Sequence, residues 1–224
     1  AYTAPSGFKA ICTTNIIAPP DASKWFYGST PDFLWIKNRS RASDHSLTDT
    51  VRGIGTSLST NTTGAEYGTD IYDMNKFGVT LIGASSRVTG LSGTTDNFVY
   101  WAWKGGATAV SGTGTGSITN VTQSPNTTSG VSIVTYTGSG ANGTVTHGLG
   151  VAPSFIIIKN MSAVGSWFVY HRKQTSATYY TILNTVAAEA SGPSAFNSTA
   201  PTSSVFSVGT NTATNGSGNN ILAY

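Results

Sequence analysis

The chain has 224 residues, of which only 9% are charged, well below the roughly 25% of ordinary soluble domains. Its five Trp, ten Tyr and nine Phe exclude a disordered chain, because such chains lack large apolar side chains and carry high net charge. The net charge of +3 arises from scattered basic residues and few acidic ones. A surface that binds nucleic acid needs clustered basic residues, so we expect no nucleic-acid partner. With the single Cys12 and no apolar run near 20 residues, we expect no intrachain disulfide and no membrane insertion.

Short runs of β-branched and aromatic residues, bounded by Gly, Asn, Ser and Pro, recur along the chain and predict strands joined by turns. In chain order, the predicted strands span residues 8–13, 24–27, 33–38, 46–51, 79–82, 97–103, 131–136, 144–147, 155–160, 167–171, 179–183, 205–208 and 220–224. The strands 131–136 and 144–147 flank a Gly-rich segment and predict a hairpin. The nearest helical candidate, 181–190, is weakened by its Thr and Val content. This spacing predicts an all-β sandwich or barrel.

An internal repeat is the most informative feature of the sequence. Pro31-Asp-Phe-Leu-Trp-Ile-Lys-Asn-Arg-Ser40 aligns with Pro153-Ser-Phe-Ile-Ile-Ile-Lys-Asn-Met-Ser162 at an offset of 122. At an offset of 123, the segment 97–101 aligns with 220–224, and 58–61 aligns with 181–184. We therefore predict two tandem copies of one antiparallel, jelly-roll-like β-sandwich module over 1–106 and 118–224. A flexible Gly/Thr/Ser-rich linker is predicted over 107–117.

The strand after the repeated Pro is apolar at consecutive positions, as in Phe33, Leu34, Trp35 and Ile36. A strand that is apolar on both faces is covered on both faces. It is therefore either a central sandwich strand or a strand with one face against a neighbouring subunit, and the second reading suggests an oligomer.

Catalytic and metal-binding patterns are sparse. The three histidines, His45, His147 and His171, form no metal-ligand motif, and Asp70 and Asp73 near Glu66 lack the ligand spacing of a calcium loop. We therefore predict no catalytic, cofactor-binding or metal-binding residues, and no enzyme activity.

Aromatic side chains offer the best candidates for a binding surface, because they can stack on sugar rings while Asn and Thr supply hydrogen bonds. The candidate glycan contacts are Trp25, Tyr27, Trp167, Tyr179 and Tyr180. The alternative is that most of these rings anchor a core or an interface, and it is the favoured reading.

Several strings resemble the uncharacterised repeated module of tailed-bacteriophage virion proteins: Phe8-Lys-Ala-Ile-Cys-Thr-Thr-Asn15, the repeated Pro31 and Pro153 segments, Val99-Tyr-Trp-Ala-Trp-Lys104 and His147-Gly-Leu-Gly150. The resemblance covers nearly the whole chain and implies a virion structural or tail-fibre-like protein, without established catalytic residues. By this resemblance, the second copy stops at Tyr224, short of residues that would match Ala102-Trp103. We therefore expect it to be truncated at its end.

The sequence and the resemblance together predict a non-enzymatic virion protein at the particle surface, part of a tail fibre or appendage that contributes to host attachment. The expected partners are copies of itself, as a trimer, other virion proteins and a host-surface glycan. Two alternatives stay open: a purely structural capsid-decoration or neck component, and a fragment of a polysaccharide-degrading tailspike. The tailspike would need two carboxylates about 5–10 Å apart in a cleft.

Overall fold

The computed structural model describes residues 30–68, 71–75, 78–81, 96–106, 109–112 and 115–224. The strands are β1 (Phe33–Asn38), β2 (Ser46–Asp49), β3 (Thr56–Ser57), β4 (Tyr67–Gly68), β5 (Ile71–Asn75), β6 (Gly78–Leu81), β7 (Phe98–Trp103), β8 (Val110–Ser111), β9 (Val121–Asn126), β10 (Val131–Thr137), β11 (Gly143–Thr146), β12 (Phe155–Asn160), β13 (Phe168–His171), β14 (Tyr179–Ile182), β15 (Ala190–Ser191), β16 (Val205–Val208) and β17 (Asn220–Ala223). Two one-turn helices, α1 (Pro193–Phe196) and α2 (Thr212–Asn215), accompany them. The predicted all-β class is confirmed. No helix among these residues is long and apolar enough to span a membrane.

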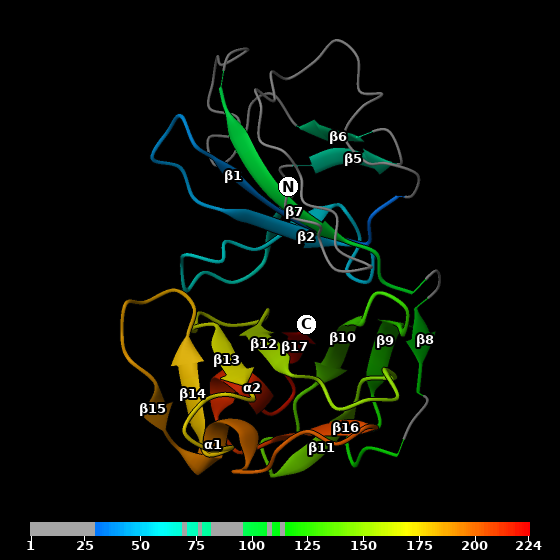
Figure 1. Ribbon diagram of the computed structural model, residues 1–224, viewed down its shortest axis with the longest axis vertical. Helices are drawn as coiled ribbons and strands as arrows, with labels where there is room; N and C mark the ends of the chain where they lie inside the picture. The colour runs from blue at the N-terminus through cyan, green and yellow to red at the C-terminus, as the bar shows by residue number, and fades with distance from the viewer. Residues whose placement is uncertain (1–29, 69–70, 76–77, 82–95, 107–108, 113–114) are drawn as a thin grey trace, which may run out of the picture.

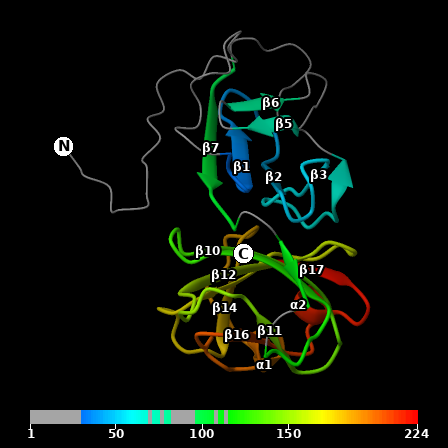
Figure 2. The same cartoon turned by 90° about the vertical axis from the view of Figure 1, so that its right-hand side faces the viewer.

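The strands are arranged in two halves that lie one above the other in Figures 1 and 2. The N-terminal half, the described residues from 30 to 106, contains the antiparallel sheet β2-β1-β7. The C-terminal half, the described residues from 109 to 224, contains an eight-stranded sheet in the order β15-β14-β13-β12-β17-β10-β9-β8. Strand β17 therefore lies in the middle of the larger sheet, and its end lies at the boundary between the halves.

The C-terminal half is a sandwich closed by the small sheet β11-β16 and the two helices. Val134, Ile156 and Ala223 from the large sheet pack with Phe196 of α1 and Phe206 of β16 in one buried apolar cluster. Alternate residues of each strand point to this cluster, as expected for a sheet with a distinct inner face.

The three strands β2-β1-β7 have the same pairing as β13-β12-β17. Phe33 of β1 pairs with Asp49 and Phe155 of β12 with His171, both pairs being related by an offset of 122. On the other side, Ile36 pairs with Tyr100 and Ile158 with Ala223, the latter strand being offset by 123. These offsets equal those of the sequence alignment.

The loop hydrogen bonds repeat in the same way. The Asn38 side chain accepts from the backbone N–H of Ser40, and the Asn160 side chain accepts from that of Ser162. The N–H of His45 is bonded to Asn61 and that of Trp167 to Asn184. Duplication of the whole module stays a prediction, since the predicted strands 8–13 and 24–27 lie outside the described residues.

The apolar strands β1 and β12 are covered on both faces within one chain. Leu34 and Ile36 of β1 point into a core of the N-terminal half. Phe33, on the other face, belongs to a buried cluster shared with Ile157, Trp167 and Leu222 of the C-terminal half. The second face is therefore covered by the other half of the chain, so this pattern no longer indicates a neighbouring subunit.

One local prediction was wrong. Strands β10 and β11 do not form a hairpin, because β10 pairs with β9 and β17 while β11 pairs with β16. No helix forms at 181–190, as the Thr and Val content of this segment indicated; it contains the end of β14, a loop and the first residue of β15. Part of the predicted flexible linker is ordered, since β8 pairs with β9 at the edge of the large sheet.

Candidate functional site

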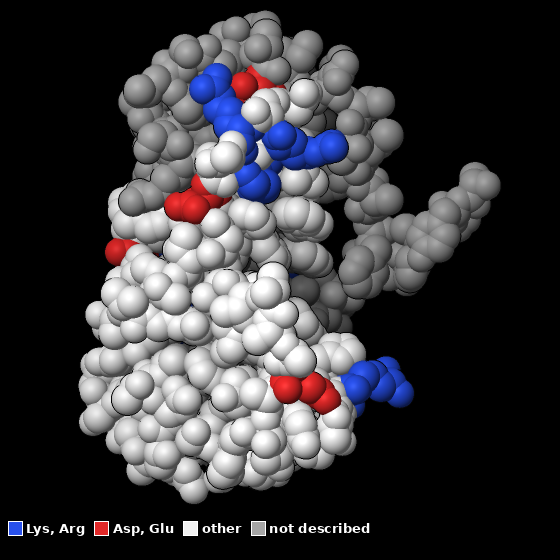
Figure 3. All heavy atoms as spheres, turned by 90° about the vertical axis from the view of Figure 1, so that its left-hand side faces the viewer, with Lys and Arg blue, Asp and Glu red and all other residues white. Residues whose placement is uncertain are grey.

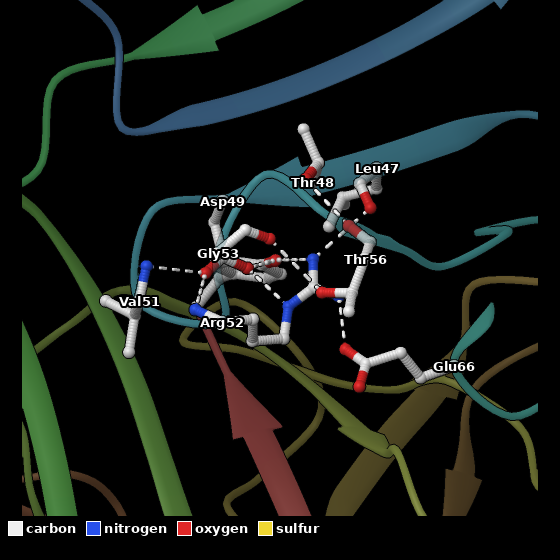
Figure 4. A network of polar contacts seen from close by, with 9 residues as sticks. Leu47, Thr48, Asp49, Val51, Arg52, Gly53, Thr56 and Glu66 are labelled. Carbon is white, nitrogen blue, oxygen red and sulfur yellow. Dashed lines mark hydrogen bonds and ion pairs between the residues drawn. The ribbon is translucent and has the colours of Figure 1, made fainter. Parts of the chain in front are cut away.

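A network of charged and polar groups lies at the junction of the two halves, and Figure 4 shows its residues in the N-terminal half. The Arg52 guanidinium lies with Nε 2.6 Å from Asp49 Oδ2 and Nη1 2.8 Å from Glu66 Oε1. The Tyr224 hydroxyl, at the end of the central strand β17, donates to Asp49 Oδ2 at 2.5 Å. The Asp49 side chain also accepts the backbone N–H groups of Val51 and Arg52, so a tight turn presents it to the network.

The charges of this network are fixed by their surroundings. Burial works to lower the pKa of Arg52, but Tyr224, Asp49 and Glu66 outweigh it and raise that pKa, so the guanidinium stays charged. Burial and the Asp49 carboxylate raise the pKa of the Tyr224 phenol, so it stays protonated and donates. The contacts of this network that cross between the halves are those of the Tyr224 hydroxyl with Asp49 and Arg52.

Further contacts cross the junction beside this network. The Trp167 indole N–H donates to the carbonyl of Ser59 at 3.0 Å, and the ring is fully buried. The Lys159 ammonium donates to the carbonyls of Thr63, across the junction, and Gly165, in its own half. The halves are therefore held together by apolar packing and by hydrogen bonds to backbone groups.

A cavity of about 550 Å³ lies beside the junction, a volume within the range of small-ligand pockets. Its walls are mostly apolar and come from both halves: Phe33, Trp35 and Trp103 from the first, and Val134, Leu149, Phe155, Ile156, Phe206 and Tyr224 among those from the second. Phe155 is 49% exposed and Val151 64% exposed, and both lie on this wall. An apolar occupant therefore fits the cavity better than a charged one.

Polar side chains, among them His147 and Ser132, line the same cavity. His147 accepts from the backbone N–H of Leu149 through Nδ1, so its Nε2 carries the proton that faces the carbonyl of Thr202. Burial lowers the pKa of His147, against the opposing effect of the Thr202 hydrogen bond, so the imidazole is neutral at pH 7. Ser132 Oγ is buried without a hydrogen-bond partner among the described residues.

A family model described as "Domain of unknown function (DUF7483)" matches residues 21–224 of the chain. The chain belongs to this family. No curated protein and no solved structure matches it. The DUF7483 match runs across both halves and the segment between them.

The structure places the predicted glycan contacts of this DUF7483 protein as follows. Trp167 lies in the buried cluster at the junction and offers no ring surface to a sugar, which corrects that expectation. Tyr179 and Tyr180 of β14 are half-buried, and Tyr180 packs on Phe168. Trp25 and Tyr27 lie outside the described residues. The predicted set is therefore not brought together as one surface.

The site residues of the DUF7483 chain that sequence reasoning missed come from loops and strand ends. Leu149 and Val151 lie in the loop between β11 and β12, Phe155 begins β12, and Ser132 is the second residue of β10. The only sequence signal at these positions is the apolar run that Phe155 opens. Among the described residues, no group of three or more His, Cys, Asp or Glu side chains could hold a metal ion.

Proposed function

We propose that this DUF7483 protein is a non-enzymatic structural module of a bacteriophage virion, part of a tail fibre or surface appendage. The observation that supports it is the junction, where the Tyr224 hydroxyl of the C-terminal half bonds to Asp49, which is paired with Arg52 in the N-terminal half, an arrangement that favours one stiff unit. A stiff unit transmits force along an appendage, whereas two modules on a free tether would swing.

The surface composition supports the same proposal. After Gly106, the sequence contains only four charged residues: Lys159, Arg172, Lys173 and Glu189. Figure 3 shows a face on which the C-terminal half is almost bare of charge, while basic side chains gather over the N-terminal half. Charged residues are depleted at the cores of protein interfaces, so a surface with few charges suits packing against other proteins in an assembly.

Attachment to a host-surface glycan is the finer part of the proposal, and one surface feature favours it. Trp101 is 40% exposed and packs against the partly buried Trp35, with ring centroids 5.2 Å apart and planes tilted by 49°. An exposed indole is a platform on which a sugar ring can stack. A purely structural role is the second candidate, favoured by the burial of Trp167.

Immunogold electron microscopy tests the virion assignment, with antibodies raised against this chain and applied to phage particles that encode it. Labelling of tails or appendages is the expected result, and particles without label would overturn the proposal. A glycan array with the intact chain and a Trp101→Ala variant tests attachment. Binding that the variant loses supports attachment, while no binding leaves the purely structural role.

A further inference from the structure

The loop that joins β1 to β2, residues 39–45, carries two exposed arginines, Arg39 and Arg41. With Lys37 near the end of β1, they place three basic residues within five positions of the sequence. Figure 3 shows basic side chains gathered over this half, on a face where the C-terminal half is almost bare of charge. Local positive charge of this kind attracts negatively charged ligands. The loop is therefore a candidate contact for such a ligand.

Hydrogen bonds fix the shape of this loop. The Lys37 ammonium donates to the carbonyl of Ser43 at 2.7 Å and so ties the loop to the end of β1. The backbone N–H of Arg39 donates to the carbonyl of Asn97 at 2.7 Å, and the N–H of Asn97 donates to the Ser40 hydroxyl at 2.8 Å. The arginines therefore extend from a backbone that is already ordered, which lowers the entropic cost of binding.

The two arginines have N–H groups available for a ligand. Nε of Arg41 lies 2.6 Å from Asp96 Oδ2, while Nη1 and Nη2 have no partner among the described residues. No carboxylate in the described ranges pairs with Arg39. The remaining carboxylate of the loop, Asp44, accepts from the Asn61 side chain. A guanidinium held at Nε presents its other N–H groups in a fixed direction, and paired N–H groups match the two oxygens of a carboxylate.

The C-terminal half contains the same loop scaffold. The Lys159 ammonium donates to the carbonyl of Gly165 at 2.6 Å. The N–H of Met161 donates to the carbonyl of Asn220, and the N–H of Asn220 donates to the Ser162 hydroxyl, both at 2.9 Å. These three bonds match those of the first loop at the offsets of 122 and 123. The two loops are therefore built alike.

The two loops differ in the residues that they carry and in their contacts. Met161 stands at the place of Arg39, and Ala163 at the place of Arg41. The second loop faces the other half of the chain, since the Met161 carbonyl accepts from the N–H of Glu66 at 3.2 Å. The first loop carries its arginines on an exposed surface. Because the same scaffold forms with apolar residues at these places, the arginines are not needed to shape it, and they are available for contacts outside the chain.

The exposed indole of Trp101 belongs to the same sheet as this loop. Trp101 pairs with Trp35 of β1, and the Trp35 indole N–H donates to His45 Nδ1 at 3.0 Å. Side chains alternate along a strand, so Trp35, Lys37 and Arg39 follow one another on one face. The four residues from Trp35 to Arg39 span about 13 Å. A ligand that touches both the indole and the arginines is therefore an oligosaccharide rather than a single sugar.

We infer that this loop and Trp101 bind an acidic glycan, a polysaccharide whose sugars carry carboxylates. Arg41 and Arg39 hold carboxylates of the ligand through charge-assisted hydrogen bonds. The indole takes the face of a neighbouring sugar ring. This inference rests on the proposed attachment role and names the class of glycan that is bound.

The test is calorimetric titration of the intact chain with oligogalacturonate and with oligosialic acid, each beside its methyl ester. Esterification removes the negative charges and keeps the sugar backbone. We expect an acid form to bind, and its ester to bind with roughly tenfold or more lower affinity. Equal affinity for an acid and its ester would show a site for neutral sugars and overturn the inference.

Two double variants locate the site. Arg39→Met with Arg41→Ala places the residues of the matching loop on the same scaffold, and it should lower the affinity roughly tenfold or more. Arg172→Met with Lys173→Ala removes the same charge from an exposed loop of the C-terminal half. At physiological salt, this control should change the affinity by less than about twofold. Equal losses in the two variants would mean general attraction between charges and overturn the inference.

A single variant guards against damage to the fold. Arg39→Met leaves the pair of Arg41 with Asp96 intact, so it should fold as the original chain does and still bind the acid form more weakly. Unchanged affinity of this variant would overturn the role of Arg39. Polyglutamate, a polyanion without sugar rings, should bind more weakly than the acidic oligosaccharide, and Trp101→Ala should remove this preference. Equal affinity of the original chain for polyglutamate would overturn the assignment to a glycan.

The outcomes separate this inference from the attachment role on which it rests. Glycan binding that Trp101→Ala loses but the double arginine variant keeps would overturn only the acidic class. The same holds if neither acidic oligosaccharide binds while a neutral glycan on the array does. If no glycan of either kind binds, the attachment role is overturned together with this inference.

Discussion

The hydroxyl of Tyr224 donates a hydrogen bond of 2.5 Å to the carboxylate of Asp49, although the two residues are 175 positions apart. The same carboxylate oxygen lies 2.6 Å from Nε of Arg52, whose side chain is almost completely buried. Tyr224 belongs to the central strand of the C-terminal half and Asp49 to the edge strand β2 of the other half. The bond thus links the two halves through one shared buried carboxylate.

Removal of the Tyr224 hydroxyl should weaken the whole chain rather than one half. We expect Tyr224→Phe to lower the free energy of unfolding by about 1–3 kcal/mol, because a hydrogen bond to a buried charged group is lost. Asp49→Asn should cost about 3–5 kcal/mol, because Arg52 then keeps a buried charge with a weaker partner. Urea unfolding followed by circular dichroism measures both changes.

A double-mutant cycle separates coupling across the junction from general damage. Tyr224→Phe and Asp49→Asn should be non-additive, since the first removes and the second weakens the same bond. Tyr136→Phe is the matched control, because its hydroxyl bonds to the Thr214 carbonyl inside the C-terminal half. The losses in free energy of unfolding caused by Tyr136→Phe and Asp49→Asn should add. Additive losses for Tyr224→Phe and Asp49→Asn would contradict coupling across the junction.

The two matching Asn side chains should differ in their contribution to stability. The Asn184 side chain accepts a hydrogen bond from the backbone N–H of the fully buried Trp167. The Asn61 side chain, which is exposed, accepts one from the backbone N–H of His45. Asn184→Ala should therefore lower the free energy of unfolding by about 1–3 kcal/mol, and Asn61→Ala by about 0.5 kcal/mol or less. Thermal unfolding of the two variants side by side measures the difference, and equal losses would argue against burial as the cause.

The sequence was sufficient to predict strands where apolar runs are long. Residues 33–38, 155–160 and 205–208 were predicted with the bounds that the structure shows. It missed β9, because Pro125 and polar residues break the strand pattern, although its backbone pairs with β10. The pairing of β10 with β17 and the packing of the two halves depend on contacts between distant residues. Periodicity along the chain therefore reveals neither this strand pairing nor the packing of the halves. The cavity beside the junction could not be predicted for the same reason.

Gly106 tests whether the end of the N-terminal half is packed against the C-terminal half or leads into a free tether. A methyl group on Gly106 would lie 2.5 Å from the carbonyl oxygen of Pro125, a distance at which the backbone must move. We expect Gly106→Ala to lower the free energy of unfolding by about 1–3 kcal/mol, as overpacking does. Gly55→Ala is the control, since a methyl group there meets nothing within 4 Å. Equal stability of the two variants in urea would support a free tether.

Lys159 should make stability depend on pH above neutrality. Burial lowers the pKa of Lys159 to about 8, whereas an unfolded chain keeps a lysine pKa of about 10.4. Between these values the unfolded state binds more protons than the folded state, so the free energy of unfolding gains a contribution that rises with pH. The neutral amine still has two N–H donors, enough for the carbonyls of Thr63 and Gly165.

The difference between the original chain and a Lys159→Met variant isolates this contribution, because tyrosines and other groups that titrate in alkali are common to both. Urea unfolding between pH 7 and 10 should show the stability of the original chain rising relative to the variant. The exposed Lys173→Met variant should show no such change. A constant difference across this range would mean that Lys159 stays protonated in the folded state, and its two carbonyl bonds would then act as charged bonds at every pH tested.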